Sequence, residues 1–170
     1  DINLFVKYGM ISEEKFYEKV ESLALLESVD GKMRTFDEYK KYISKTQKDK
    51  DKNHVILYTT DTDKQDSFIQ DAKNRNYDVV VFNNVIDSHY INHLEQKLEK
   101  TQIKRVDADI LDKLIDKDEK KEAVITEENQ KELKEIFEKI IDNNSTVLTV
   151  DALSPDDSPV TITLPEFFRR

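Results

Sequence analysis

The sequence predicts an α/β fold: a helical connector, then a small three-stranded parallel αβα unit, then the beginning of an α+β domain. Three short runs rich in β-branched and aromatic residues alternate with two amphipathic stretches of helical spacing, an order typical of a parallel sheet. Two of the runs are continuously apolar, which indicates strands covered on both faces. The predicted strands are His54–Thr59, Tyr77–Phe82 and Ile103–Val106, within an αβα unit over residues 53–112.

Residues 1–52 are expected to form the helical connector. Ser12 is suited to cap a helix because acidic residues follow it and complement the helix dipole. Gly31 would end that region, and a second helix would begin near Thr35. Residues 45–53 contain no apolar side chain, so we expect a solvated link into the first strand. The two apolar stripes are Phe16, Val20, Leu23 and Leu26, and then Phe36, Tyr39 and Ile43.

Two crossover helices, near residues 63–74 and 87–100, should connect the three strands. Parallel strands need cover on both faces. Because this prediction gives the unit no third helix of its own, we expect the N-terminal helices to pack beside it. The predicted buried residues are Phe68, Ile69 and Ala72 in the first helix and Ile91, Leu94 and Leu98 in the second.

The rest of the chain is expected to hold a linker and the start of a second domain. Residues 113–125 are dense in charge and predict an interdomain linker. In the α+β domain over 126–170, Thr126 would cap a helix, and strands at 146–150 and 160–163 would flank a turn. The apolar stripe of that helix is Leu133, Ile136, Phe137, Ile140 and Ile141.

Composition excludes several classes of protein. The 170 residues carry a formal net charge of −9, which argues against nucleic-acid binding because such proteins present a basic face to phosphates. There is no cysteine, which excludes disulfides and thiolate chemistry and fits a reducing compartment. No apolar run reaches about 18 residues, so we expect no membrane partner. Residues 164–170 resemble the first turn of an unfinished helix, so we expect a truncated fragment of a longer protein.

The carboxyl ends of the predicted strands, where α/β folds usually bind ligands, show no sign of catalysis. The turns there hold Thr59–Thr62 and Asn83-Asn84, without a glycine that would let the backbone approach a phosphate. No nucleophile can be paired with a base, so we expect no enzyme and no catalytic, cofactor-binding or metal-binding residues. A receiver domain is disfavoured because Asn83 cannot accept a phosphoryl group.

Two further patterns suggest metal ions. His89 and His93 stand four apart on a predicted helix, with Asp87 nearby as a third ligand, but two exposed histidines on a solvated face explain them better. Residues 61–66 begin like a calcium loop, yet the glycine and glutamate of that loop are missing. A strand exit followed by a helix cap is the better interpretation.

The exposed face of the second crossover helix is the candidate interaction surface. Ser88, His89, Asn92 and the ring of Tyr90 are amphipathic groups on a rigid element, and such a face could contact a polypeptide. An ordinary helix surface explains the same pattern equally well.

Five segments, spread over nearly the whole chain, carry a resemblance to a known family. They are Leu4–Phe16 with its Lys-Tyr-Gly, Thr35–Tyr39, Gln47 with Val55–Thr60, Val85–Asp87, and Asp157–Ile162. In order and spacing they resemble the KYG, SLxxY, QxIYYIT, PIDE and DSP motifs of the ninety-kilodalton heat-shock chaperones of bacterial HtpG type. Val85 stands where the family has proline.

The resemblance implies a fragment of an ATP-dependent chaperone that assists protein folding, made of the late middle domain and the start of the C-terminal dimerisation domain. The family binds ATP and Mg²⁺ in an N-terminal domain, so the fragment would hold no cofactor. The parent would be a cytoplasmic homodimer and the fragment a monomer. In the parent, the fragment would couple closure of the ATPase clamp to the dimer interface.

The family's client-contact patch falls on Ser88, His89 and Asn92, of which Asn92 keeps the residue type. The implied partners are therefore unfolded or partly folded client proteins. The alternative, from another class of protein, is a stand-alone doubly wound protein-interaction or signalling module.

Overall fold

The computed structural model describes residues 2–117, 126–141, 146–151, 159–165 and 167, and the chain forms two compact units. The first unit comprises Asp1–Asp118 and Thr161–Arg170, and the second comprises Glu119–Val160. All of the buried residues among those described belong to the first unit. The first unit therefore supplies the folded core on which any site must be built.

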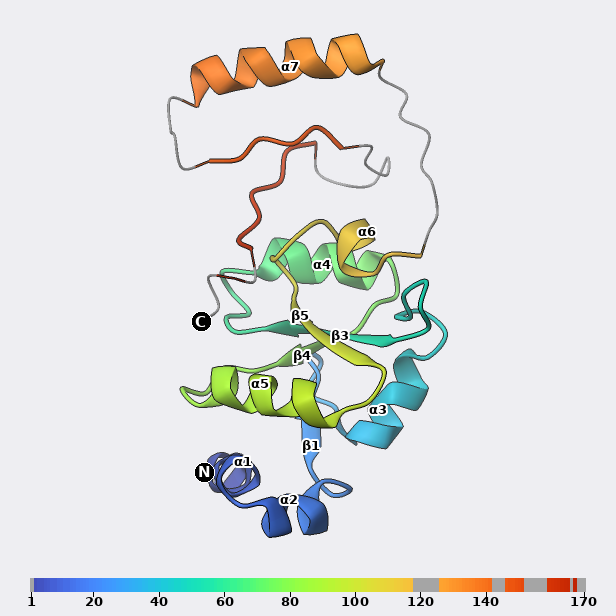
Figure 1. Cartoon of the computed structure of the whole chain (residues 1–170), viewed down its shortest axis with the longest axis vertical. Coiled ribbons are helices and arrows are strands. Elements are labelled where there is room, and N and C mark those ends of the chain that lie inside the picture. Colours follow the sequence, from blue (N-terminus) through green and yellow to red (C-terminus); the bar gives the residue numbers. More distant parts are fainter. Residues whose placement is uncertain (1, 118–125, 142–145, 152–158, 166, 168–170) are drawn as a thin grey trace. The chain divides into compact units, whose positions relative to one another are not determined.

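A three-stranded parallel sheet forms the centre of the first unit (Figure 1). Its strands are β3 (His54–Thr59), β4 (Val79–Val81) and β5 (Thr101–Arg105), in the order β4-β3-β5. The central strand β3 is buried from Val55 to Thr59, as its continuous apolar run requires. The predicted α/β fold class is confirmed.

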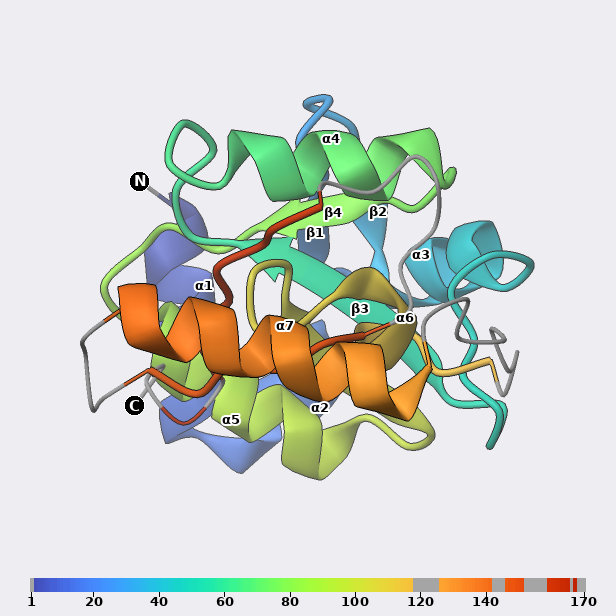
Figure 2. The same ribbon diagram turned by 90° about the horizontal axis from the view of Figure 1, so that it is seen from above.

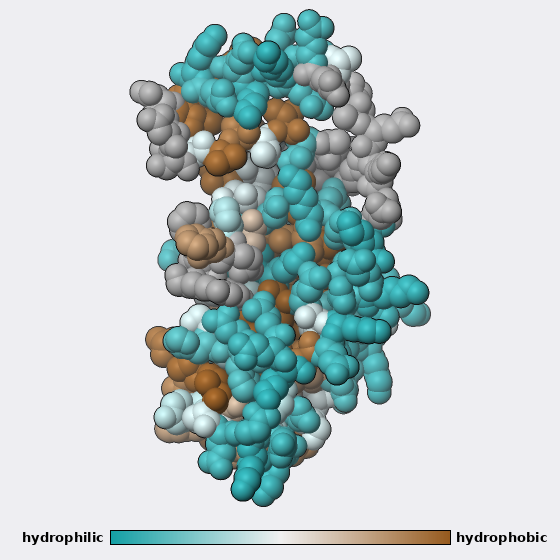
Figure 3. Space-filling model, viewed as in Figure 1, coloured by the Kyte–Doolittle hydropathy of each residue, from teal (hydrophilic) through white to brown (hydrophobic). Residues whose placement is uncertain are grey.

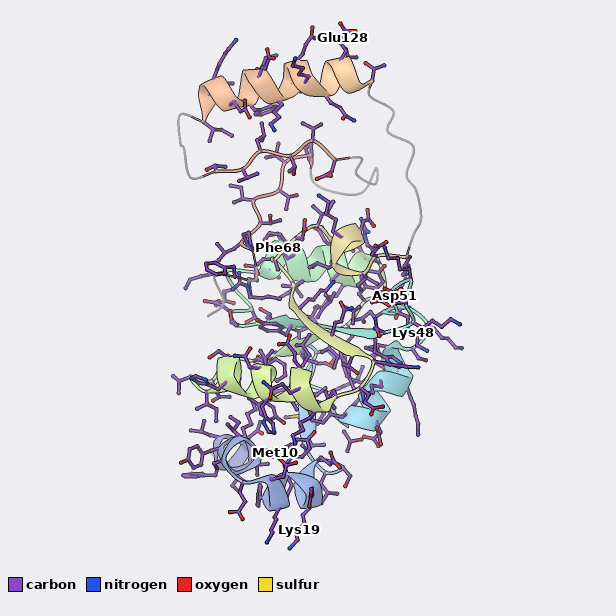
Figure 4. All side chains as sticks on the ribbon, in the orientation of Figure 1. Met10, Lys19, Lys48, Asp51, Phe68 and Glu128 are labelled. Atoms are coloured by element: carbon purple, nitrogen blue, oxygen red, sulfur yellow. The ribbon has the colours of Figure 1, made fainter. Side chains whose placement is uncertain are left out.

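Helices cover both faces of this sheet, as Figures 1 and 2 show. α4 (Asp66–Asn74) and α6 (Leu111–Leu114) lie on one face, and α5 (Asp87–Lys97) lies on the other. Phe68, labelled in Figure 4, packs from α4 onto the buried cluster of its face. The expectation that the unit has no third helix is wrong, because four residues in a charge-dense run are too few to show a helical period. This run buries Leu111, Leu114 and Ile115.

The N-terminal helices pack beside the αβα unit, as predicted, and they do so on the α5 side of the sheet. α1 (Ile2–Ser12) and α2 (Glu14–Val20) lie beyond α5, and α3 (Phe36–Ile43) lies nearer the sheet (Figure 1). Their buried residues join those of α5 and the sheet in one hydrophobic cluster, which includes Met10, labelled in Figure 4. Thr35 caps α3 with a capping box, so the predicted start of that helix is confirmed.

The first 35 residues contain more elements than predicted. The helix expected to carry Leu26 ends at Val20, and Leu26 lies instead in a β-hairpin. The hairpin pairs β1 (Leu25–Glu27) with β2 (Met33–Thr35), and Gly31 in its turn has a φ of 79°, a conformation that glycine adopts without strain. α1 was not predicted because its apolar residues lie on several sides and form no single stripe.

The hairpin also covers the outer edge of β4. Ser28 forms an antiparallel bridge with Val80, and the N–H of Val29 donates to the C=O of Val79 at 2.9 Å. Ser28 Oγ donates to Asp78 Oδ2 at 2.6 Å. An edge strand with unpaired groups invites pairing with another chain, and this contact shields the edge.

The polar stretch before β3 is not the solvated link that was expected, because Gln47 is fully buried. Gln47 Nε2 donates to the C=O of Val55 at 3.0 Å and to that of Asp78 at 3.1 Å. Gln47 Oε1 accepts from the N–H of Asp78 at 2.6 Å. One amide thus ties the start of β3 to the residue before β4, and composition could not reveal a single buried side chain.

The second unit contains α7 (Glu127–Ile140), and Thr126 caps it as predicted, with Oγ1 accepting from the N–H of Asn129 at 3.4 Å. The residues predicted to form an apolar stripe do lie in or directly after the helix α7. The stripe is not buried, however, since Ile136, Phe137 and Ile140 are exposed. α7 is the longest of the described helices, and none of them is long and apolar enough to span a membrane.

Neither of the two strands predicted after α7 forms in the described residues 146–151 and 159–165. An isolated hairpin is marginally stable and needs further strands or a helix to bury one face. Val147 and Ile162 are instead 88% and 86% exposed. The two strand predictions are therefore wrong for these residues, while most of the predicted turn between them lies outside the described residues.

We expect Gln47→Ala to lower the free energy of unfolding by about 2–4 kcal/mol, because it removes three hydrogen bonds and leaves buried peptide groups unsatisfied. Urea unfolding of the full chain measures this change. The control is Gln96→Ala, at an exposed position of α5, which should change the stability by less than about 0.5 kcal/mol. Equal effects of the two substitutions would show that the Gln47 network is not structural.

Candidate functional site

A cavity of about 350 Å³ opens at the carboxyl ends of the parallel strands, the usual ligand position in α/β folds. Three elements meet there: the end of β3, the turn after β4 with the first turn of α5, and the end of β5. Arg105 is held by the Asp107 carboxylate and donates through Nη2 to the C=O of Leu164 at 3.0 Å. The lining includes Tyr58, Phe82, Asn83, Asn84, Ser88 and Arg105.

The polar donors at the end of β3 are used within the protein. Gln65 is 6% exposed, and its Oε1 accepts from Thr59 Oγ1 at 2.6 Å, from the N–H of Thr60 at 3.0 Å and from that of Asp61 at 3.4 Å. Nucleotide-binding α/β domains use backbone N–H groups of such a turn to bind phosphate. Because Gln65 already binds these groups, this turn does not fit a phosphate.

The three predicted client-contact residues lie on the first two turns of α5. Ser88 is half-buried and lines the cavity, Asn92 is half-buried one turn later, and His89 is exposed. Residues four apart share one face of a helix, whereas neighbours point about 100° apart. Ser88 and Asn92 therefore share one face, and His89 and Asn92, three apart, are also neighbours on the helix surface, with His89 on the exposed side. Their role in client contact stays a prediction.

Tyr90 does not belong to this face, contrary to the prediction. Its side chain is 2% exposed, its ring lies edge-on to that of Phe82 with centroids 6.3 Å apart, and its hydroxyl donates to Met10 Sδ at 3.6 Å. Burial raises the pKa of the Tyr90 hydroxyl well above its usual value. The reason is helical spacing, since Tyr90 shares a face with the buried Asp87 and Leu94.

A buried ion pair joins α1 to the first turn of α5. Lys7 Nζ lies 2.7 Å from Asp87 Oδ1, and the two side chains are 5% and 3% exposed. Asp87 Oδ2 also accepts from the N–H of Asn84 at 3.0 Å. Lys7 Nζ lies 5.2 Å from the ring centroid of Phe82 and 5.6 Å from that of Tyr90, within cation–π range. Both charges are thus compensated, as burial demands.

Sequence reasoning did not pair Lys7 with Asp87, although each lies in a segment that resembles a family motif. The two are 80 positions apart, and no local pattern links them.

The glycine of the first motif has its own role, because a Cβ on Gly9 would lie 2.8 Å from the ring of Phe16. Gly9 lets α1 and α2 approach closely.

His89 and His93 have different surroundings. The ring of His93 packs edge-on against that of Tyr17, with centroids 5.1 Å apart, while His89 is exposed. Asp87, considered as a third metal ligand, is bound to Lys7. Within the described part of the chain, no three His, Cys, Asp or Glu side chains are grouped so that they could hold a metal ion.

Apolar side chains also reach the surface beside the ion pair. Figure 3 shows brown side chains at the lower left, over α1 and the turn that leads into α5. The outer side of α1 is therefore apolar, although the opposite side of the same helix is buried. The exposed residues are Ile2, Phe5, Tyr8 and Val85.

The chain matches bacterial chaperones along its whole length. It is 39% identical over 173 aligned positions to the chaperone protein HtpG of Bacteroides fragilis (strain 638R), covering 100% of the chain and 25% of that protein. For HtpG of Bacteroides thetaiotaomicron the identity is 37%, with the same coverage. For HtpG of Porphyromonas gingivalis (strain ATCC 33277) it is 36%, covering 99% of the chain and 25% of that protein. The chain thus spans about a quarter of the length of these curated relatives.

Among solved structures, the middle domain of a Plasmodium falciparum heat-shock protein matches 60% of the chain and 43% of its own length. The TM-score is 0.46 and the sequence identity 20%. No family model matches the chain. The resemblance drawn from the five sequence segments is confirmed by the full-length matches.

We expect Lys7→Met to lower the free energy of unfolding by about 3–5 kcal/mol, because it leaves the Asp87 carboxylate buried without its partner. Asp87→Leu added to Lys7→Met should recover part of this loss, since it removes the unpaired charge. Urea unfolding of both variants measures the effect.

The matched control is Lys32→Met, because Lys32 pairs with Asp30 on the surface, with side chains 64% and 39% exposed. This substitution should cost less than about 1 kcal/mol. If Lys7→Met costs no more than Lys32→Met, the buried pair does not hold α1 against α5.

Proposed function

The chain is homologous over its full length to the HtpG chaperones of the ninety-kilodalton heat-shock family, and from this premise we propose that it is part of an ATP-dependent molecular chaperone that assists protein folding. The end-to-end alignment is the observation that carries this proposal. Within such a chaperone, residues 1–112 would form the late middle domain and 113–125 a linker. Residues 126–170 would begin the C-terminal dimerisation domain.

We propose that the first unit transmits movement between the ends of the chaperone. Lys7 and Asp87 fix α1 to α5, α5 packs on the sheet, and Gln47 ties the sheet to the segment after α3. A unit whose layers are joined by satisfied buried polar groups is rigid, so it moves as one body when one end is displaced. In the parent, this would couple closure of the ATPase clamp to the dimer interface.

ATP and Mg²⁺ would bind in the parent's N-terminal domain, outside this stretch, and the chain alone would not be an enzyme. The use of the donors after β3 by Gln65 supports this part of the proposal, because a phosphate would need those N–H groups.

The partners would be unfolded or partly folded client proteins, contacted by Ser88, His89 and Asn92. The position of Ser88 on the cavity, with Asn92 one turn away, supports a surface that can donate and accept hydrogen bonds to a polypeptide main chain. The parent would be a homodimer and this stretch a monomer, located in the cytoplasm without a membrane partner. A net charge of −9 disfavours nucleic acid as a partner.

A stand-alone doubly wound interaction or signalling module is the alternative. It is disfavoured because the whole chain aligns within chaperones that are about four times as long.

Backbone NMR of the isotopically labelled chain tests the client surface. We expect chemical-shift changes at Ser88, His89 and Asn92 on titration with reduced, carboxymethylated lactalbumin, which stays unfolded, and none with native lactalbumin. Replacing all three residues by alanine should weaken binding about tenfold, a loss of about 1.4 kcal/mol spread over three contacts.

The matched control replaces three exposed polar residues of α4, on the other face of the sheet, by alanine: Ser67, Gln70 and Lys73. This variant should bind as the unchanged chain does. Shifts that appear equally with native lactalbumin, or that survive the α5 substitutions, would place client contact elsewhere.

A further inference from the structure

The contact between α2 and α5 contains an imidazole nitrogen with no hydrogen-bond partner. His93, on α5, packs its ring against that of Tyr17, on α2, with an interplanar angle of 75°. His93 Nε2 is buried and has no partner among the described residues. A neutral imidazole tolerates one unpaired nitrogen, whereas an imidazolium carries a charge and an N–H donor on both nitrogens, so the charged form is penalised here.

The charges around His93 do not compensate a second cation. Lys97 forms an ion pair with Glu14, and Lys97 Nζ also lies 5.5 Å from the ring centroid of Tyr17. The acid and the aromatic face that would best stabilise an imidazolium are therefore already engaged by an ammonium group. The charged groups that act on the two rings of this contact are Glu14 on α2, Glu21 directly after α2, and Lys97 on α5. Lys7 on α1 is bound to Asp87, and His89 on α5 is exposed.

The direction of the pH effect follows from these surroundings. Burial lowers the pKa of His93, Lys97 lowers it further, and Glu14 acts in the opposite direction. An unfolded histidine titrates near pH 6.5, so the unfolded chain binds this proton more tightly than the folded chain. The packed state is therefore fully favoured above about pH 6.5 and loses stability as the pH falls from there toward the folded pKa.

We propose that His93 is an acid-sensitive contact between α2 and α5, which holds α2 in place while neutral and releases it when protonated. Release would expose the ring of Tyr17 and loosen the corner between α1 and α2. The Lys7–Asp87 pair and the sheet do not depend on this contact. The packing of α2 in the first unit thus depends on pH, a property beyond the proposed chaperone role.

The test follows the His93 Cε1–H resonance and the amide protection factors of α2 in the full chain, from about pH 7.5 to about pH 5. We expect the midpoint of His93 below the unfolded value. The amide protection factors of α2 should fall about threefold for each half pKa unit between the unfolded and folded values of His93. One pKa unit corresponds to a tenfold change in the opening equilibrium. His93→Gln should abolish this fall, whereas the control His89→Gln, at an exposed position, should keep it.

Two charge variants keep the test decisive if His93→Gln disturbs packing. Glu14→Gln should lower the His93 midpoint, and Lys97→Gln should raise it, since their charges act on it in opposite directions. A His93 midpoint at or above the unfolded value overturns the proposal. So does a loss of α2 protection in acid that persists in His93→Gln.

Discussion

Lys7 and Asp87 are both almost completely buried, and the arrangement of the first unit depends on their contact. Either charge alone in that position would cost several kcal/mol, so α1 cannot leave α5 without a large loss of stability. The rings of Phe82 and Tyr90 close the site around the ammonium group, and Asn84 binds the second carboxylate oxygen. Because α5 in turn packs on the sheet, the N-terminal helices and the αβα unit form one block.

Polar groups elsewhere in this block serve the fold in the same way. Gln47 binds peptide groups beside two strands, and Gln65 binds the donors that follow β3. A sheet end closed by its own side chains is suited to transmitting force and contacting a partner, and poorly suited to holding a phosphate. The cavity beside Ser88 and Arg105 lies next to that closed turn, where the proposed client surface begins.

The sequence was informative where the signal is local. The strand His54–Thr59 follows from a continuous apolar run, and the start of a helix near Thr35 was also predicted. The structure has both at the predicted residues. What it could not show is non-local. The Lys7–Asp87 pair spans 80 positions, and the hairpin around Gly31 depends on pairing with the edge of β4. Of the candidate site, the position of Ser88, His89 and Asn92 on the second crossover helix was predicted, but the burial of Tyr90 depends on α1, which the sequence pattern did not reveal.

Native-state hydrogen exchange of the full chain tests most directly whether α1 and α5 form one block. If they do, the slowest amides of α1, near Lys7, and of α5, near Tyr90, exchange through the same opening and share one free energy. Exchange of α1 through a separate opening, at a free energy lower by more than about 2 kcal/mol while α5 stays closed, would contradict it.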